Sequence, residues 1–284
     1  NLKSLAKAGV TAKSLIPSYP SMTFPNQYTL VTGMYPGNHG IVANDFIDPK
    51  REDRFNRSNP STLLDGSWYG GTPLWVAAEQ QGMLSASYFW VGSEADIQGI
   101  RPTYLEKYDQ SVPNRERIEK VLDWLAQPDT SRPHLITLYF SVVDSIGHYR
   151  GIDSDELKAA VRAIDSEIGF LIEKLNKHHL DINLIIVSDH GMVNQDAEKI
   201  IYLDDYVNLT GVRMVGLGPR TSIYIKDPKL AEQIYDKLQD QDNFDAYWRE
   251  EAPDRWHNKN KRLGDILIEA TLPRSISIRM IPNQ

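Results

Sequence analysis

The sequence of 284 residues contains no cysteine, so disulfide bonds and thiolate metal ligands are excluded, and any bound metal ion must use side chains such as Asp and His. Basic residues are fewer than acidic ones, 31 against 38, and form no stripe along the chain. The resulting net charge of −7 argues against a long nucleic acid as a partner. No apolar run approaches the length of a membrane-spanning helix.

Reactive side chains are instead concentrated in three short segments, Ser21–Asn26, Asp144–His148 and Ser188–Met192. Together these segments supply a hydroxyl nucleophile, two carboxylates and two imidazoles. A divalent-metal hydrolase that acts at a phosphorus centre uses this set of groups, and few other chemistries need it.

The first carboxylate–imidazole pair, Asp144 and His148, follows a stretch with the composition of a β-strand. Residues His134–Phe140 are mostly apolar, β-branched or aromatic. If the chain then turns into a helix, Asp144 and His148 project from one face and can share a metal ion. Gly147 between them leaves room for a close approach of backbone. An Asp cap followed by a surface histidine is the alternative interpretation.

The second pair, Asp189 and His190, follows the apolar run Leu184–Val187. Such a run is typical of a strand that is buried on both faces of a parallel sheet. Ligands of open α/β sheets bind beyond the carboxyl ends of the strands, where this pair is expected to lie. A structural Asp-His-Gly turn is the alternative, but two pairs that each follow an expected buried strand favour a metal site.

The third segment places Thr23 near the start of an expected helix. Pro20 and Pro25 bracket it, and a helical pattern continues to Val31. Backbone N–H groups and the helix dipole favour an anion at such a position. Threonine is a poor nucleophile at neutral pH unless a coordinated metal lowers its pKa. The alternative is that Thr23 is only a helix N-cap.

These segments resemble a known family. The stretches Pro17–Tyr28 and Val31–Ile41 are similar to the signature of the nucleotide pyrophosphatase/phosphodiesterase family, a branch of the alkaline phosphatase superfamily. Both Asp/His pairs match its metal motifs, and Trp75, Tyr88–Trp90 and Gly92–Glu94 also fit its pattern. The resemblance extends from the start of the chain to about Asp265.

The resemblance implies a role for each matched residue. Thr23 matches the family's nucleophile, which also contacts metal and forms a phospho-threonine intermediate. Asn44 matches an asparagine that holds the non-bridging phosphoryl oxygens. Phe24 and Tyr139 match aromatic positions that can sandwich a nucleobase, although aromatic side chains at strand ends are more often part of a core.

The resemblance also implies two Zn²⁺ ions. Asp189 and His190 match ligands of the zinc that activates the threonine, and Asp144 and His148 match ligands of the second zinc. The family's site contains one further Asp upstream and one further His downstream, and neither is present in this sequence. We therefore expect a chain truncated at both ends, with an upstream strand that ends in Asp and a downstream loop that contains His. His257 lies in a different family segment and is not assigned to metal.

The alternation of helical and strand patterns predicts an α/β fold. By resemblance, we expect one alkaline-phosphatase-like catalytic domain over residues 1–284. It would have a central mixed, mostly parallel sheet with helices on both faces. A small α+β lobe is expected from about residue 211 to 284. Predicted elements are helices over 113–125, 153–177 and 229–239, strands over 221–225 and 265–268, and a long polar loop over 48–71.

The sequence therefore predicts a zinc-dependent phosphodiesterase or nucleotide pyrophosphatase that acts on a small nucleotide or other phosphodiester. The family resemblance implies a periplasmic or secreted location. The alternatives are a phosphomonoesterase or phospholipid-headgroup diesterase of the same superfamily, or a binding homologue without catalysis. A sulfatase is disfavoured because it needs a Cys or Ser nucleophile in a different motif.

Overall fold

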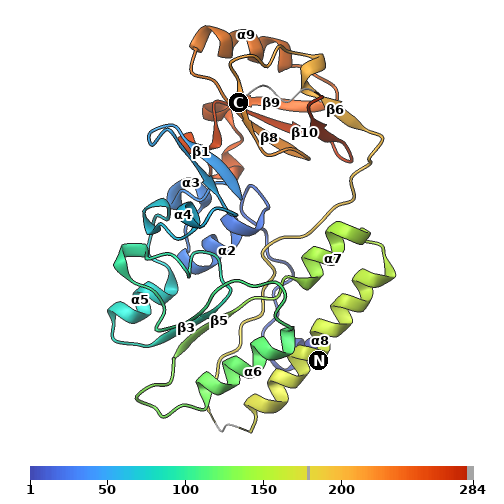
Figure 1. The fold of residues 1–284 in the computed structure, drawn as a ribbon. Coiled ribbons are helices and arrows are strands. Elements are labelled where there is room, and N and C mark those ends of the chain that lie inside the picture. The colour runs from blue at the N-terminus through green and yellow to red at the C-terminus, as the bar shows by residue number, and fades with distance from the viewer. Residues whose placement is uncertain (178–179, 280–284) are drawn as a thin grey trace. The chain divides into compact units, whose positions relative to one another are not determined.

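The computed structural model describes residues 1–177 and 180–279 (Figure 1). The chain divides into two compact units made of interleaved segments. Unit 1 contains residues 1–17, 64–67 and 72–192, and unit 2 contains residues 18–63, 68–71 and those from 193 onward. The prediction of a single catalytic domain over the whole chain stays a prediction. Within the described residues, no helix combines the length and hydrophobicity that a bilayer crossing requires.

The sheet of unit 1 is parallel and has three strands in the order β4–β3–β5. These strands are β3 (Ser85–Tyr88), β4 (Tyr104–Glu106) and β5 (Leu135–Leu138). In the register, Ala86 of β3 is opposite Tyr104 of β4 and Ile136 of β5. The strand predicted within residues 134–140 is therefore confirmed over its middle.

Helices cover both faces of this sheet. From α5 (Leu74–Gln80), Glu79 Oε1 accepts hydrogen bonds from the backbone N–H and the hydroxyl of Ser85, at 2.8 and 2.7 Å. On the other side, apolar side chains of α6 (Asn114–Leu125) pack with Ala86. Successive side chains of a strand point to opposite faces, so α5 and α6 lie on opposite faces. The helix predicted over residues 113–125 is confirmed.

Two further helices of unit 1 pack against each other, α7 (Val142–Arg150) and α8 (Asp155–Leu175), and α1 (Leu2–Ala8) contacts α8 (Figure 1). The hydroxyl of Ser154 caps α8 by accepting a hydrogen bond from the N–H of Leu157 at 3.1 Å. The helix predicted over residues 153–177 is thus confirmed with slightly shorter ends.

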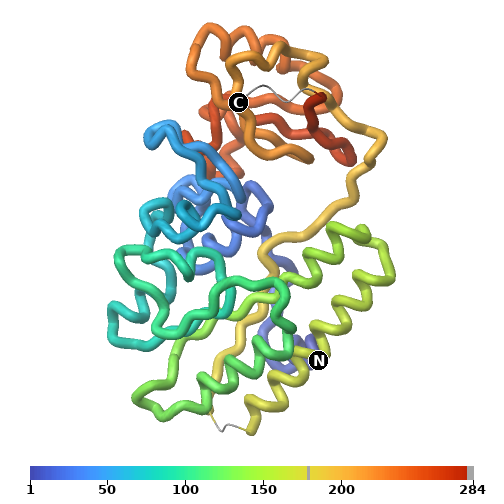
Figure 2. Tube along the Cα trace, in the orientation of Figure 1, coloured from blue at the N-terminus to red at the C-terminus, as the bar shows by residue number. Residues whose placement is uncertain are grey.

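The strand predicted over Leu184–Val187 is wrong. Figure 2 shows the chain from residue 180 onward as an extended trace, and Leu184–Val187 do not form a strand. Ile185 is 83% exposed. An apolar sequence does not form a strand alone, because its backbone N–H and C=O groups need a neighbouring strand. Within the described residues no strand pairs with this run, and β5 pairs only with β3.

Unit 2 contains a four-stranded antiparallel sheet in the order β7–β8–β10–β9. Its strands are β7 (Arg213–Val215), β8 (Arg220–Tyr224), β9 (Phe244–Trp248) and β10 (Ile266–Ala270). Helix α9 (Pro228–Leu238) packs its buried face into the same hydrophobic core. A parallel pair, β6 (Ile200–Tyr202) with β11 (Ser275–Ser277), lies in the same unit. The two strands and the helix predicted for this region are confirmed.

The long loop predicted over residues 48–71 is also wrong. Strand β1 (Asp45–Asp48) pairs with β2 (Asp53–Asn56) in an antiparallel hairpin, and α4 (Pro60–Leu63) follows. Phe55 and Trp68 are fully or almost fully buried. Polar residues outnumber apolar ones in this stretch, yet these two large aromatic side chains remove enough surface from water to order it.

The remaining helices of unit 2 are α2 (Thr23–Thr32) and α3 (Pro36–His39). Short 3₁₀ turns occur at Gly66–Trp68, Ile97–Gly99, Leu203–Asp205, Arg249–Glu251, Asp254–Trp256 and Lys261–Leu263. The structure is therefore of the α/β class with both parallel and antiparallel sheets, as the sequence predicts.

Candidate functional site

Thr23 is the first residue of α2, and Met22 is the N-cap. The interpretation of Thr23 as the N-cap is therefore wrong, while its predicted place at the start of a helix is confirmed. This helix start offers fewer backbone donors than the sequence predicts. The N–H of Phe24 already donates to Asn44 Oδ1 at 3.0 Å, and Pro25 has no N–H.

Asn44 lies just before β1 and is half-buried. Because its Oδ1 accepts the hydrogen bond from Phe24, its amide nitrogen is left with two N–H donors. No hydrogen bond joins this nitrogen to another described residue. Such N–H donors bind anionic oxygens. The orientation of the Asn44 amide therefore agrees with the phosphoryl-binding role that its family match implies.

Asn26 is a residue of this region that the sequence reasoning missed. It is 3% exposed, and its Oδ1 accepts a hydrogen bond from the N–H of Ser18 at 2.7 Å. Its amide nitrogen donates to the carbonyls of Ser18, Pro20 and Met22 at 3.2, 2.9 and 2.9 Å. One side chain thus fixes the loop that precedes Thr23. The available signal was an asparagine in the first turn of a helix, directly after proline.

Asp144 and His148 lie one turn apart on α7, as predicted. Ser141 is the N-cap, so the alternative of Asp144 as a cap is wrong. Asp144 Oδ1 and His148 Nε2 are 3.4 Å apart. Two ligands on one tetrahedral zinc are separated by about 3.3 Å, given Zn–N and Zn–O distances near 2.0–2.1 Å. The pair therefore has the separation that a shared metal ion requires.

Asp189 and His190 belong to the extended segment after α8 rather than to the end of a strand. Asp189 Oδ1 accepts a hydrogen bond from the N–H of His190 at 3.1 Å. His190 Nδ1 lies 2.9 Å from the carbonyl oxygen of Gly191, which can only accept. The proton of a neutral imidazole is therefore on Nδ1, and Nε2 presents its lone pair, which is the usual preparation of a metal-binding histidine.

These four side chains form one cluster in unit 1. His190 Nε2 lies 3.7 Å from Asp189 Oδ2 and 3.9 Å from Asp144 Oδ1, so Asp144 contacts both histidines. Asp144 Oδ1 and Asp189 Oδ2 are buried and accept no hydrogen bond from the described residues. Buried carboxylate oxygens without a donor are costly unless a cation neutralises them.

The donor atoms of this cluster are therefore of the kinds that bind a metal ion, but they do not lie close enough together to form a complete chelate. Among residues 1–177 and 180–279, no three carboxylate or imidazole groups converge closely enough to hold one ion. The separations of 3.7 and 3.9 Å are wider than the tetrahedral value, and only the Asp144–His148 pair matches it.

Gly147 explains how the segment with His190 approaches α7. A Cβ atom at Gly147 would overlap the sulfur of Met192. The Met192 side chain thus occupies the space that any larger residue at position 147 would need. The sequence predicts a close backbone approach here, and the structure shows a close side-chain approach instead.

The two predicted base-binding aromatics differ in their surroundings. Tyr139 follows β5 and packs in the unit 1 core, and its carbonyl accepts a hydrogen bond from Arg117 at 3.0 Å. Burial raises the pKa of Tyr139, and the negative charges of Asp189 and Asp144 raise it further. Phe24 is half-buried in unit 2 and contacts Phe55 edge-on. Their role in binding a base stays a prediction.

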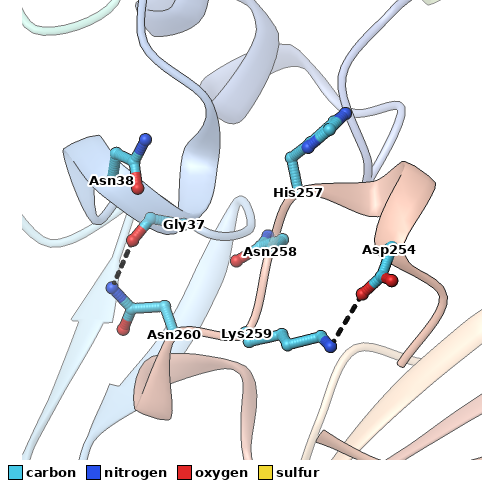
Figure 3. Close-up of a pocket in the computed structure, with 7 residues that line it drawn as sticks. All are labelled: Gly37, Asn38, Asp254, His257, Asn258, Lys259 and Asn260. Atoms are coloured by element: carbon cyan, nitrogen blue, oxygen red, sulfur yellow. Dashed lines mark hydrogen bonds and ion pairs between the residues drawn. The ribbon is translucent and has the colours of Figure 1, made fainter. Parts of the chain in front are cut away.

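A separate surface cavity of about 510 Å³ lies in unit 2 (Figure 3). Its walls include Asn260, which donates to the carbonyl of Gly37 at 2.9 Å, and the ion pair between Lys259 and Asp254, also 2.9 Å long. His257, which is not assigned to a metal, is another wall residue. No predicted site residue lines this cavity.

A family model described as type I phosphodiesterase/nucleotide pyrophosphatase matches residues 1–279. The chain belongs to this family. Membership confirms the resemblance carried by the residues around Thr23 and by the two Asp/His pairs.

Curated relatives share this family. A pyrophosphatase/phosphodiesterase of Schizosaccharomyces pombe is 38% identical over 278 residues, which cover 94% of this chain and 57% of that protein. Human ectonucleotide pyrophosphatase/phosphodiesterase family member 1 is 42% identical over 228 residues, which cover 80% of this chain and 24% of that protein. The chain thus spans only part of the length of the curated relatives that it matches.

Solved structures confirm the fold. Murine ectonucleotide pyrophosphatase/phosphodiesterase 5 superposes with a TM-score of 0.92 at 31% identity, covering 99% of this chain and 76% of that one. An inactive variant of the same murine protein, with a threonine replaced by alanine and AMP bound, superposes with a TM-score of 0.91. It is also 31% identical, over 97% of this chain and 74% of that one.

Proposed function

We propose that this chain forms the catalytic part of a zinc-dependent hydrolase of phosphodiester and pyrophosphate bonds in nucleotides. The observation that supports this function most directly is the cluster of Asp144, His148, Asp189 and His190, with its unpartnered buried carboxylate oxygens. Family membership gives the reaction class, and the AMP complex of the murine protein supports a nucleotide as substrate.

Thr23 is the proposed nucleophile. Its Oγ1 forms a bond to phosphorus while the bond from phosphorus to the leaving-group oxygen breaks, and the hydroxyl proton is released to solvent. Water then cleaves the phospho-threonine and regenerates the hydroxyl. The murine variant that is inactive after a threonine-to-alanine change supports a threonine in this role. Asn26 contributes indirectly, because its hydrogen bonds fix the loop before Thr23.

Two Zn²⁺ ions are the proposed cofactors. Asp189 and His190 would hold one ion, and Asp144 and His148 would hold the other. The family match alone assigns Thr23 to the first ion. When bound, zinc lowers the pKa of coordinated hydroxyl groups and offsets the negative charge of the transition state. Mixed nitrogen and oxygen ligands favour zinc over magnesium, which prefers oxygen ligands and water.

Asn44, Phe24 and Tyr139 are the proposed substrate contacts. The free N–H donors of Asn44 would bind the non-bridging oxygens of the phosphoryl group, where charge increases during the reaction. The rings of Phe24 and Tyr139 would bind the base, since nucleobases stack on aromatic side chains.

We also propose a location outside the cytoplasm, either periplasmic or secreted. The curated relatives include proteins named as ectonucleotide enzymes and as venom phosphodiesterases.

Comparison of substrates tests the function. In a form that also contains the upstream Asp and the downstream His that the resemblance implies, the protein should hydrolyse bis-(p-nitrophenyl) phosphate and a dinucleoside polyphosphate after zinc is added, with a clear preference over p-nitrophenyl phosphate. A preference for the monoester would contradict the substrate class. Absence of any turnover by zinc-loaded protein, with His190→Ala as the matched blank, would favour a binding protein instead.

A further inference from the structure

The structure assigns Asn208 as an acceptor of an N-linked glycan. Asn208, Leu209 and Thr210 form the sequence Asn-Xaa-Thr with a middle residue other than proline, the pattern that N-glycosylation requires. This inference goes beyond the proposed hydrolysis and depends only on the proposed location outside the cytoplasm.

Buried and exposed side chains alternate along this segment, and the alternation leaves the acceptor asparagine in solvent. Val207 and Leu209 are 5% and 6% exposed and belong to the core of unit 2, whereas Asn208 and Thr210 are exposed. Leu209 therefore anchors the segment from its inner side, while both polar residues face solvent. A bulky glycan on Asn208 would not disturb the packing beneath it.

The local hydrogen bond leaves the reactive atoms accessible. Asn208 Oδ1 accepts a hydrogen bond from the N–H of Thr210 at 2.9 Å, which brings the asparagine amide and the threonine close together. Among the described residues, no group bonds to Asn208 Nδ2 or to the Thr210 hydroxyl. The segment lies between the 3₁₀ turn Leu203–Asp205 and β7, and Gly211, with a φ of 80°, turns the chain after it.

The chemistry requires a lipid-pyrophosphate-linked oligosaccharide as donor. A bond forms between Asn208 Nδ2 and C1 of the first sugar, while the bond from C1 to the pyrophosphate oxygen breaks. The amide loses one proton, and the lipid pyrophosphate leaves as an anion. The product is a neutral N-glycosyl amide on the exposed side chain of Asn208.

A second Asn-Xaa-Ser sequence provides a matched control. Asn56 Oδ1 accepts a hydrogen bond from the N–H of Ser58 at 2.8 Å. However, Asn56 is half-buried at the end of β2, and its backbone groups exchange hydrogen bonds with the hydroxyl of Thr62 at 3.2 and 3.0 Å. Asn56→Gln therefore removes a similar sequence without touching residues 207–211.

The test is to direct the chain into the secretory pathway of a yeast host and to purify it from the medium. Treatment with peptide-N-glycosidase in ¹⁸O water should convert Asn208 to ¹⁸O-labelled aspartate, as read by peptide mass spectrometry. Thr210→Ala should abolish this label, Thr210→Ser should retain it, and Asn56→Gln should leave it unchanged. The substitutions at Thr210 lie at an exposed position and leave the buried residues Val207 and Leu209 unchanged.

Unmodified Asn208 in the secreted protein would overturn the inference, as would a label at Asn208 that persists in Thr210→Ala. Hydrolytic activity is measured on the same preparation. Glycan at Asn208 without any diester hydrolysis would contradict the proposed function and leave this inference in place.

Discussion

The side-chain oxygen of Asn44 accepts a hydrogen bond from the backbone N–H of Phe24 at 3.0 Å, across 20 residues of sequence. This contact joins the start of β1 to the first turn of α2. It also orients the amide, because an oxygen bound to an N–H leaves the nitrogen to act as a donor.

Replacement of Asn44 by Asp separates these two effects. The carboxylate of Asn44→Asp can still accept the hydrogen bond from Phe24, but it has no N–H donors and repels a phosphate. We expect kcat/KM to fall by about 10²–10³, the usual cost of losing one donor to the transition state, with little change in Tm. Asn44→Ala should in addition lower the free energy of unfolding by about 1 kcal/mol. Full activity of Asn44→Asp would exclude a donor role.

Replacement of Thr23 by Ala tests the nucleophile. Hydrolysis of a diester should fall by several orders of magnitude, since removal of a nucleophile typically has this effect. Zinc content, measured by atomic absorption, should remain near that of the wild type because the Asp/His cluster is unchanged. Thr23→Ser keeps a hydroxyl and should retain measurable turnover. Activity of Thr23→Ala close to wild type would show that the covalent mechanism is wrong.

Removal of metal tests the cofactor. Chelation should abolish activity, and zinc should restore it better than magnesium, because the ligands combine imidazole nitrogens with carboxylate oxygens. His148→Ala should weaken binding of one zinc more than the other, as titration calorimetry would resolve. Complete recovery with magnesium in zinc-free buffer would contradict the proposed ligand set.

Substitution of Gly147 tests how α7 and the His190 segment are held together. In Gly147→Ala the new methyl group overlaps the sulfur of Met192. Met192 is flexible and can move to relieve this overlap, and alanine favours a helix over glycine by about 1 kcal/mol. The unfolding free energy should therefore change little, whereas the displaced Met192 should lower zinc affinity. Shortening the partner in Gly147→Ala/Met192→Ala should recover part of the affinity. If the double variant instead loses as much zinc affinity as the two single variants together, positions 147 and 192 are not coupled.

His39 should make the stability of unit 2 depend on pH. It is fully buried, and burial lowers its pKa from 6.5 to about 4. Its Nδ1 accepts a hydrogen bond from the N–H of Ile41 at 3.2 Å, and Nε2 is 3.0 Å from the hydroxyl of Thr29, so the neutral ring is the folded form.

Because the unfolded chain binds this proton more readily, stability is full above pH 6.5 and is lost as the pH falls towards 4. The loss should reach about 3 kcal/mol in total, of which about 2 kcal/mol should be apparent by pH 5. Urea unfolding of the wild type and of His39→Gln at several pH values measures this loss of unfolding free energy. The variant should show a shallower dependence over this range, and equal slopes would contradict a buried neutral His39.

Local patterns in the sequence were sufficient for several features. Apolar residues three and four apart predict α8 within about two residues of its ends, since a helix satisfies its own backbone and needs only one buried face. Spacing alone likewise placed Asp144 and His148 on one helical face. The start of α2 at Thr23 followed from the two prolines around it.

Tertiary structure decided the features that depend on distant partners. Leu184–Val187 has the composition of a strand, but a strand forms only where a neighbour pairs with its backbone. The contact of Asp144 Oδ1 with both histidines, and the hydrogen bond from Phe24 to Asn44, join segments that no periodicity relates. The sequence by itself therefore determined which residues could do chemistry. Only the fold decided which of their atoms lie together, because hydrogen bonds and burial act between elements that are far apart in the chain.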